Sequence, residues 1–323
     1  MATTKRLFKS FYRLLLPVIV LLLLAIAAVS IGFVYKTSRP RAAKYLVTPE
    51  KYGRFSARGA RVTDETWTNR DGTSARGWLL RGAEKAPAVI LFHRYGADRS
   101  YVLNLGVKLN EATNFTILMP DLRAHGENPP VANSSFGGCE TDDAAVAIDF
   151  LQSLKGENQT NFIGRDIGVY GVELGALVAL SAAAKNESIK AIALDSVPAN
   201  SNTLMSATIV KSFPFASDLT TKLAEFGTRA YFYDGCYKND SLCEAAKQMT
   251  NRDVLLLAGA DAPAFQSSTE KLSRCFPQNT RLETKTDFNP SGYSITNASL
   301  EQSEAYDQRV IAFFKQSLES AEQ

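Results

Sequence analysis

Residues 167–184 read IGVYGVELGALVALSAAA, and this stretch decides the fold. Residues 167–170 form a short apolar run, as a strand buried on both faces requires, and residues 174–184 are almost wholly apolar, as in a central helix. Gly171, Glu173 and Gly175 stand at the junction. Because glycine allows two backbone segments to approach closely, the stretch predicts a sharp strand-to-helix turn with Glu173 at its middle.

Other segments repeat this alternation. Further candidate strands with apolar runs lie at residues 88–92, 115–119, 189–194 and 254–258, and residues 281–286 are a further candidate strand without such a run. Residues 141–154 and 306–318 have helical patterns, and residues 61–68 and 75–81 flank an Asp-Gly turn typical of a β-hairpin. The alternation predicts an α/β fold with a mostly parallel sheet and helices on both faces. Residues 198–250 break the rhythm and predict an insertion, or cap, with one or two helices around Cys236 and Cys243.

The N-terminal region is different in character. Residues 14–35 read LLLPVIVLLLLAIAAVSIGFVY, which is 22 residues without a charge. At 1.5 Å per residue such a helix is about 33 Å long, enough to cross a hydrocarbon layer of about 30 Å. We predict a single-pass membrane anchor after a basic segment at residues 1–13 and before a linker at residues 36–60. A cleaved signal peptide and a buried core helix are the alternatives.

We expect residues 1–36 to contribute nothing to the core of the globular domain, which we place at residues 61–323. The chain carries a net charge of +3, yet residues 1–44 hold eight Lys or Arg and no acid. The rest of the chain therefore has more acids than bases, which argues against nucleic acid as a partner.

Cysteine and histidine usage limits the chemistry. Cys139, Cys236, Cys243 and Cys275 allow three disulfide pairings, and Cys236 and Cys243 are close enough in sequence to bridge a loop. Four unpaired thiols are the alternative. Disulfides would place the globular domain outside the cytoplasmic membrane. The chain has only two His and no CxxC spacing, so we predict no metal site and no cofactor.

Polar motifs follow three of the predicted strands, where parallel sheets carry their functional residues. These motifs are His93-Arg94-Tyr95-Gly96, residues 120–128 (PDLRAHGEN) and Gly171-Val172-Glu173-Leu174-Gly175. In type and order they resemble the motifs of the α/β-hydrolase superfamily, especially its lipase, esterase and aminopeptidase-like serine hydrolases, over residues 60–318. The resemblance implies an α/β-hydrolase fold, an oxyanion turn at Arg94, Tyr95 and Leu174, and a nucleophile elbow between Gly171 and Gly175.

The sequence departs from this pattern at the catalytic positions. Glu173 occupies the nucleophile position, and Arg94 replaces a glycine of the oxyanion turn. Asp261 matches the acid position, with Asp195 as a second candidate. The only histidines are His93 and His125, so no histidine follows the last strand, and Asn289 is the candidate for that place.

A serine mechanism needs a nucleophile and a base that takes its proton, and both are missing. Glu173 would stand at a helix N-terminus and fill the oxyanion hole with its own carboxylate. Ser196 and Ser291 are the remaining candidate nucleophiles. We also expect Asp121 and Arg123 to pair with each other near their turn.

We therefore predict a membrane-anchored, catalytically inactive protein that acts in binding or scaffolding, with a small acyl or peptide-like ligand. The alternative is a hydrolase of ester or peptide-like substrates that uses unconventional catalytic residues. A third interpretation, a purely structural partner protein, requires side chains of residues 198–250 to fill the cleft.

Overall fold

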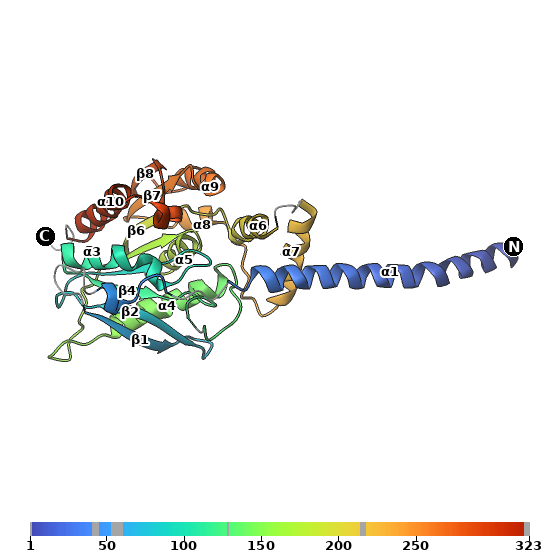
Figure 1. Cartoon of the computed structure of the whole chain (residues 1–323), viewed down its shortest axis with the longest axis horizontal. Coiled ribbons are helices and arrows are strands. Elements are labelled where there is room, and N and C mark those ends of the chain that lie inside the picture. The colour runs from blue at the N-terminus through green and yellow to red at the C-terminus, as the bar shows by residue number, and fades with distance from the viewer. Residues whose placement is uncertain (1, 41–44, 53–60, 128, 214–217, 320–323) are drawn as a thin grey trace.

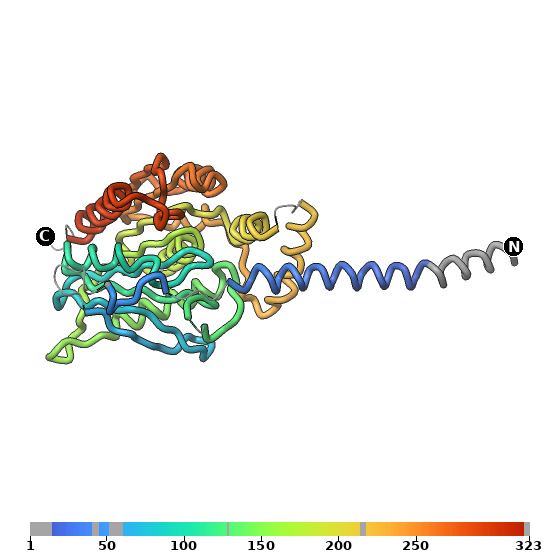
Figure 2. Tube along the Cα trace, in the orientation of Figure 1, coloured from blue at the N-terminus to red at the C-terminus, as the bar shows by residue number. Residues whose placement is uncertain are grey.

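The computed structural model describes residues 2–40, 45–52, 61–127, 129–213 and 218–319. The predicted linker at residues 36–60 lies partly outside these ranges, and so do the side chains of the basic segment at residues 1–13. The described residues form one α/β body from which a long N-terminal helix projects (Figures 1 and 2).

The sheet has eight strands among the described residues, in the order β1-β2-β4-β3-β5-β6-β7-β8. β1 pairs antiparallel with β2 and β2 antiparallel with β4, whereas every other pairing is parallel. The predicted hairpin and the mostly parallel sheet are therefore confirmed. The strands are β1 (Val62–Thr68), β2 (Ser74–Leu80), β3 (Ala88–Phe92), β4 (Thr116–Pro120), β5 (Ile167–Val172), β6 (Ile189–Asp195), β7 (Asp253–Gly259) and β8 (Arg281–Phe288).

Helices cover both faces of the sheet, as predicted (Figure 1). The cores on the two faces are separate, one beneath α4, α5, α8 and α9 and the other beneath α3 and α10. The described helices are α1 (Ala2–Thr37), α2 (Pro49–Tyr52), α3 (Leu103–Thr113), α4 (Gly138–Ser153), α5 (Leu174–Ala183), α6 (Ser201–Ser212), α7 (Asp218–Tyr231), α8 (Leu242–Ala246), α9 (Pro263–Ser273) and α10 (Leu300–Glu319), with 3-10 turns at Arg99–Val102 and Gly292–Asn297.

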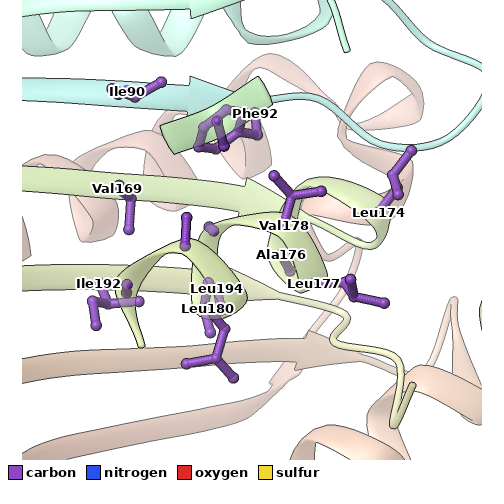
Figure 3. Packing of buried hydrophobic residues seen from close by; sticks show 14 of the residues in the cluster. Ile90, Phe92, Val169, Leu174, Ala176, Leu177, Val178, Leu180, Ile192 and Leu194 are labelled. Carbon is purple, nitrogen blue, oxygen red and sulfur yellow. The ribbon is translucent and has the colours of Figure 1, made fainter. Parts of the chain in front are cut away.

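α5 is the central helix that its apolar sequence predicts. Its side chains belong to the same buried cluster as those of β3, β5 and β6, and Leu174, Val178 and Leu180 are fully buried (Figure 3). Because a helix that is apolar on every side has no face for water, it must be enclosed. The start of α5 is therefore held rigidly against the ends of three strands.

α1 projects from the body and is apolar over Leu15–Thr37, with a mean hydropathy of 2.9 (Figure 2). Only 6% of its most apolar window is buried, so the core-helix alternative is wrong. The chain has an N-terminal apolar helix that could serve as a membrane anchor or as a signal sequence.

The last turns of α1 are part of the globular body, so the expectation that residues 1–36 contribute nothing to it is wrong. Ser30 and Val34 are 3% exposed and pack where α7 crosses α1 (Figure 1). A Cβ atom on Gly227 of α7 would lie 3.0 Å from the Ser30 carbonyl oxygen and from Val34 Cγ2. Phe33 meets Phe213, after α6, edge to face. Small residues at the crossing allow the two helices to approach closely.

The described residues of the cap, 198–213 and 218–250, contain three helices, α6, α7 and α8, rather than the one or two expected. Disulfides join Cys139 to Cys236 and Cys243 to Cys275. Of the three pairings that the sequence left open, the one that joins Cys236 to Cys243 is therefore not formed, and the alternative of unpaired thiols is wrong. The first disulfide ties the cap to the start of α4, and the second ties α8 to the residues after α9.

Candidate functional site

Glu173 lies at the turn between β5 and α5 with φ 53° and ψ −105°. A positive φ is strained for a residue with a Cβ atom and persists only where the surroundings enforce it. A Cβ atom on Gly171 would lie 2.2 Å from the Gly175 carbonyl, and one on Gly175 would lie 2.4 Å from the Phe92 oxygen. The turn therefore requires glycine on both sides of Glu173.

The Glu173 carboxylate is 5% exposed and points at the turn that follows β3. Its Oε2 accepts a hydrogen bond of 2.9 Å from the backbone N–H of Tyr95, and the nearby backbone N–H of Leu174 also favours the charged form of the carboxylate. Burial raises the pKa of Glu173 to about 7. The positive charges of Arg94 and Lys211 act in the opposite direction, and so do the two N–H groups.

Arg94 is half-buried beside this carboxylate. Its guanidinium carbon lies 5.3 Å from the centre of the Tyr101 ring and 5.0 Å from that of the Tyr293 ring. The Arg94 Nε is buried and has no hydrogen-bond partner among the described residues. The two rings therefore hold a cation whose donors are not all used.

Both histidines are buried near this turn and face backbone groups. His93 Nε2 accepts from the Leu122 N–H at 3.0 Å, so its Nδ1 carries the proton and donates to the Arg94 carbonyl at 2.8 Å. His125 Nδ1 lies 2.7 Å from the Arg123 carbonyl. Burial lowers the pKa of both imidazoles, that of His93 to about 4. Each ring is thus neutral and fixes a turn.

The segment that contains His125 also holds two charged residues that were expected to pair with each other. Asp121 instead contacts Arg76 at 3.2 Å and Arg99 at 3.6 Å. Arg123 forms two hydrogen bonds to Asp143, at 2.8 and 2.7 Å. The expected pair is therefore wrong, because each side chain meets partners from other elements.

Asp261 follows β7 and contacts Ser291 twice. Its Oδ1 accepts from the Ser291 N–H and its Oδ2 from the Ser291 hydroxyl, both at 3.1 Å. Asn289 is exposed, and its carbonyl accepts from Gln302 Nε2 at 2.8 Å. The described partner of Asp261 is thus Ser291, whose sequence position gave no signal for this contact.

Asp195, the second candidate acid, is fully buried at the end of β6. It accepts hydrogen bonds from Ser196 Oγ at 2.7 Å, the Gly292 N–H at 2.9 Å and the Tyr306 hydroxyl at 2.8 Å. Ser196 and Ser291 are also fully buried, with their oxygens 3.3 Å apart. Neither serine can meet a substrate without a rearrangement.

Glu173 lines a cavity of about 540 Å³. Its walls come from the end of α1, the turn after β3, α6 and the loop after β8. Described side chains of residues 198–250 line this cavity but leave it open. The purely structural interpretation required them to fill it. The lining residues are Lys36, Arg39, Pro40, Arg94, Tyr95, Gly96, Glu173, Ala207, Thr208, Lys211, Ser212 and Tyr293.

Of the residues that line this cavity, the sequence predicted Arg94, Tyr95 and Glu173 as site residues but not the lining residues contributed by α1 and α6. Lys36 and Arg39 were visible only as charges after an apolar span. Among the described residues, no group of three or more His, Cys, Asp or Glu could hold a metal ion. The expectation that no metal or cofactor takes part stays a prediction.

Comparisons with known proteins agree on the fold. Residues 87–227 match a family model described as the alpha/beta hydrolase fold. An esterase of Pyrococcus furiosus superposes with a TM-score of 0.65 at 19% identity, covering 87% of this chain and 98% of that one. A hyperthermophilic esterase of Pyrobaculum calidifontis gives 0.54 at 17% identity, covering 83% of this chain and 91% of that one.

A thiohydrolase of Eupenicillium brefeldianum is 29% identical over 115 residues, which are 35% of this chain. The match spans 36% of that curated relative, about a third of its length. The similarity is therefore to part of a related protein.

Proposed function

The chain has the α/β-hydrolase fold, and from this premise we propose that it is a membrane-anchored binding protein in which Glu173 has replaced the serine chemistry of the site. The ligand occupies the cavity above Glu173, and the cap forms one wall. The observation that carries this proposal is the hydrogen bond from the Tyr95 N–H to Glu173 Oε2.

In serine hydrolases of this fold, backbone N–H groups at the elbow and the neighbouring turn stabilise the oxyanion of the tetrahedral intermediate. Here the N–H groups of Tyr95 and Leu174 are directed at the Glu173 carboxylate. An ester carbonyl would have to displace a buried carboxylate to reach them. The group that stands in the nucleophile position therefore also blocks the oxyanion site.

The residues that lie where a general base is expected support the same proposal. Both histidines make hydrogen bonds to backbone groups of the turns after β3 and β4. In the loop after β8, where the catalytic histidine is expected, the residue that contacts Asp261 is Ser291. A hydroxyl has no basicity at neutral pH, so Ser291 cannot accept a proton from a nucleophile. Asp261 is the acid of the site in this proposal, and Asn289 the residue at the place of the missing histidine.

The anchor completes the proposal. In this proposal the exposed apolar stretch of α1 holds the chain in a membrane. The two disulfides support an extracytoplasmic position for the body, because disulfides form and persist in oxidising compartments. A cleaved signal sequence would instead remove this helix. Mass measurement of the mature chain tests this directly, because retention of residues 15–37 supports the anchor and their loss contradicts it.

Labelling with a fluorophosphonate probe tests for serine chemistry, since the probe reacts with an activated serine. We expect no labelling of the full-length protein in a neutral detergent. A labelled peptide that contains Ser196 or Ser291 would contradict the proposal.

A second candidate function is hydrolysis of ester or peptide-like substrates with Glu173 as an unconventional base. The comparisons favour this function over an inactive protein, because the similar proteins include esterases and a thiohydrolase. The pKa of Glu173, raised to about 7, would also suit a general base at neutral pH. A rate of ester hydrolysis that rises through pH 7 and is lost in Glu173→Gln would establish this function and overturn the first.

A further inference from the structure

The cavity above Glu173 is rich in positive charge. Four basic side chains line it: Lys36 and Arg39 at the end of α1, Arg94 after β3 and Lys211 on α6. Among the described residues of the lining, Glu173 is the only acidic one. The four cations come from three separate segments of the chain, so the fold brings them together.

These cations have no carboxylate partner within ion-pair distance in the part of the chain that the structure describes. Arg39 Nε donates to Asn133 Oδ1 at 3.1 Å, and its guanidinium carbon lies 4.1 Å from the centre of the Tyr35 ring. Arg94 is held between two tyrosine rings with its Nε unpaired. Other basic residues of the body, such as Arg123, are paired. Glu173 is the one carboxylate near these cations among the described lining residues, so most of the positive charge at the cavity is left without an ion-pair partner.

We propose that this cavity binds the phosphate group of an anionic ligand, with Arg94 and Lys211 as its main contacts. This inference rests on the proposed binding function and names the ligand class. Guanidinium and ammonium groups make charge-assisted hydrogen bonds to phosphate oxygens, which are stronger than neutral ones. A phosphodiester carries one negative charge and a phosphate monoester up to about two, so either offsets part of this positive charge, whereas a neutral ester offsets none of it.

The position of α1 indicates where such a ligand comes from. From residue 15, where the description of side-chain exposure begins, to residue 29, all side chains of α1 are exposed except the half-buried Ile26. This stretch is about 22 Å long at 1.5 Å per residue, shorter than a hydrocarbon layer of about 30 Å. The layer must then reach the turns of α1 that α7 crosses. On α7, Leu219 and Phe226 are 66% and 68% exposed, on the same side as the basic Lys222 and Arg229.

Helices that lie in a membrane interface direct Leu or Phe side chains toward the acyl chains and Lys or Arg side chains toward the headgroups, and α7 exposes both kinds of side chain. Lys36 and Arg39 come next along the chain, directly after the turns of α1 that α7 crosses. The cavity therefore opens at the height of lipid headgroups, and the phosphate of an anionic phospholipid is the source that this placement favours. A soluble phosphate monoester shares the same chemistry and is separated from it by the test.

The test measures binding to the full-length protein in a neutral detergent by native mass spectrometry. The probes are phosphatidylglycerol, zwitterionic phosphatidylcholine and glycerol 3-phosphate. We expect saturable binding of phosphatidylglycerol at least ten-fold tighter than that of phosphatidylcholine. Glycerol 3-phosphate that binds as tightly as phosphatidylglycerol supports the phosphate site and assigns it a soluble ligand. Equal affinity for the two lipids, with no binding of glycerol 3-phosphate, overturns the proposal.

Variants assign the contacts. Arg94→Gln should weaken binding roughly ten-fold, and Lys211→Gln, on the exposed side of a helix, about three-fold. Lys247→Gln removes an exposed lysine that pairs with Glu244 and should leave affinity unchanged. Glu173→Gln removes the only negative charge of the lining and should tighten binding. If Arg94→Gln fails to fold, Lys211→Gln and Glu173→Gln decide, and unchanged affinity in both overturns the proposal.

The same preparation separates this inference from the function on which it rests. Absence of phosphatidylglycerol and glycerol 3-phosphate binding without any ester turnover overturns the phosphate site and leaves the binding function intact. Ester turnover that Glu173→Gln abolishes overturns the binding function, whatever the lipid measurements show.

Discussion

The backbone N–H of Tyr95 donates to Glu173 Oε2 across 2.9 Å, although 78 positions separate the two residues in the sequence. The hydroxyl of the same tyrosine donates to the Thr37 carbonyl at the end of α1. One residue therefore links the elbow carboxylate to the apolar N-terminal helix. A helix that looks separable in the sequence is tied to the wall of the candidate site.

Gly175 should tolerate no side chain. In Gly175→Val the new Cβ would lie 2.4 Å from the Phe92 oxygen and 2.7 Å from the His93 oxygen, both backbone atoms that cannot move away cheaply. We expect the free energy of unfolding to fall by about 3 kcal/mol or more, measured by urea unfolding. Gly32→Ala, where the added Cβ meets nothing within 4 Å, is the matched control and should change little. Equal stability of both variants would argue against this turn geometry.

Removing the charge of Glu173 should stabilise the protein at high pH. Burial raises the pKa of Glu173 in the folded state from its ordinary value of 4.5 to about 7. Between these pH values the unfolded chain releases a proton that the folded chain keeps, so the wild type loses stability as pH rises, and the loss is complete above pH 7. Glu173→Gln should therefore gain on the order of 3 kcal/mol over wild type at pH 8.

Thermal unfolding of wild type and Glu173→Gln at pH 4.5, 6 and 8 measures this difference. The gap between the two proteins should be small at pH 4.5 and largest at pH 8. Glu244→Gln, which removes an exposed carboxylate on α8, should show no such trend. A gap that is the same at every pH would contradict a buried carboxylate at position 173.

Two truncated chains should behave differently. A chain that begins at residue 29 keeps Ser30 and Val34 against α7, whereas one that begins at residue 37 loses both. We expect trypsin to cut the shorter chain at Lys222 and Arg229 of α7 at least ten-fold faster, because unpacked helices open more often. Equal cleavage rates would mean that α1 does not support the cap.

Non-reducing peptide mapping should recover Cys139 linked to Cys236 and Cys243 linked to Cys275. Replacing Cys139 and Cys236 together by serine should cost about 2–4 kcal/mol of stability, since that bridge closes a long loop between α4 and the cap. A Cys236–Cys243 peptide would contradict the structure.

Much of the fold was predictable because its strands are short, continuously apolar and separated by helical segments. β3 and α5 illustrate this, since their sequences alone indicate burial on every side. α3 and α9 were not predicted, because neither has a marked apolar run. The crossing of α1 and α7 depends on small residues nearly 200 positions apart, Ser30 and Gly227, which no local pattern connects.

The candidate site was predictable in its elbow and less so elsewhere. Gly171, Glu173 and Gly175 stand in one short motif, so their spacing carries the turn. The contact between Asp261 and Ser291 depends on how the loop after β8 folds back, and the sequence offered Asn289 instead. Lys211 reaches the cavity only because the cap folds over the elbow, which a sequence pattern does not encode.

The most direct test of the account is the rate of p-nitrophenyl butyrate hydrolysis by the full-length wild type, Glu173→Gln and Glu173→Ser at pH 7 to 8. We predict that none exceeds a heat-denatured control: the carboxylate blocks the oxyanion site in the wild type, and Glu173→Ser restores a hydroxyl without a base. Turnover by the wild type that Glu173→Gln abolishes would contradict the account and make Glu173 a catalytic residue.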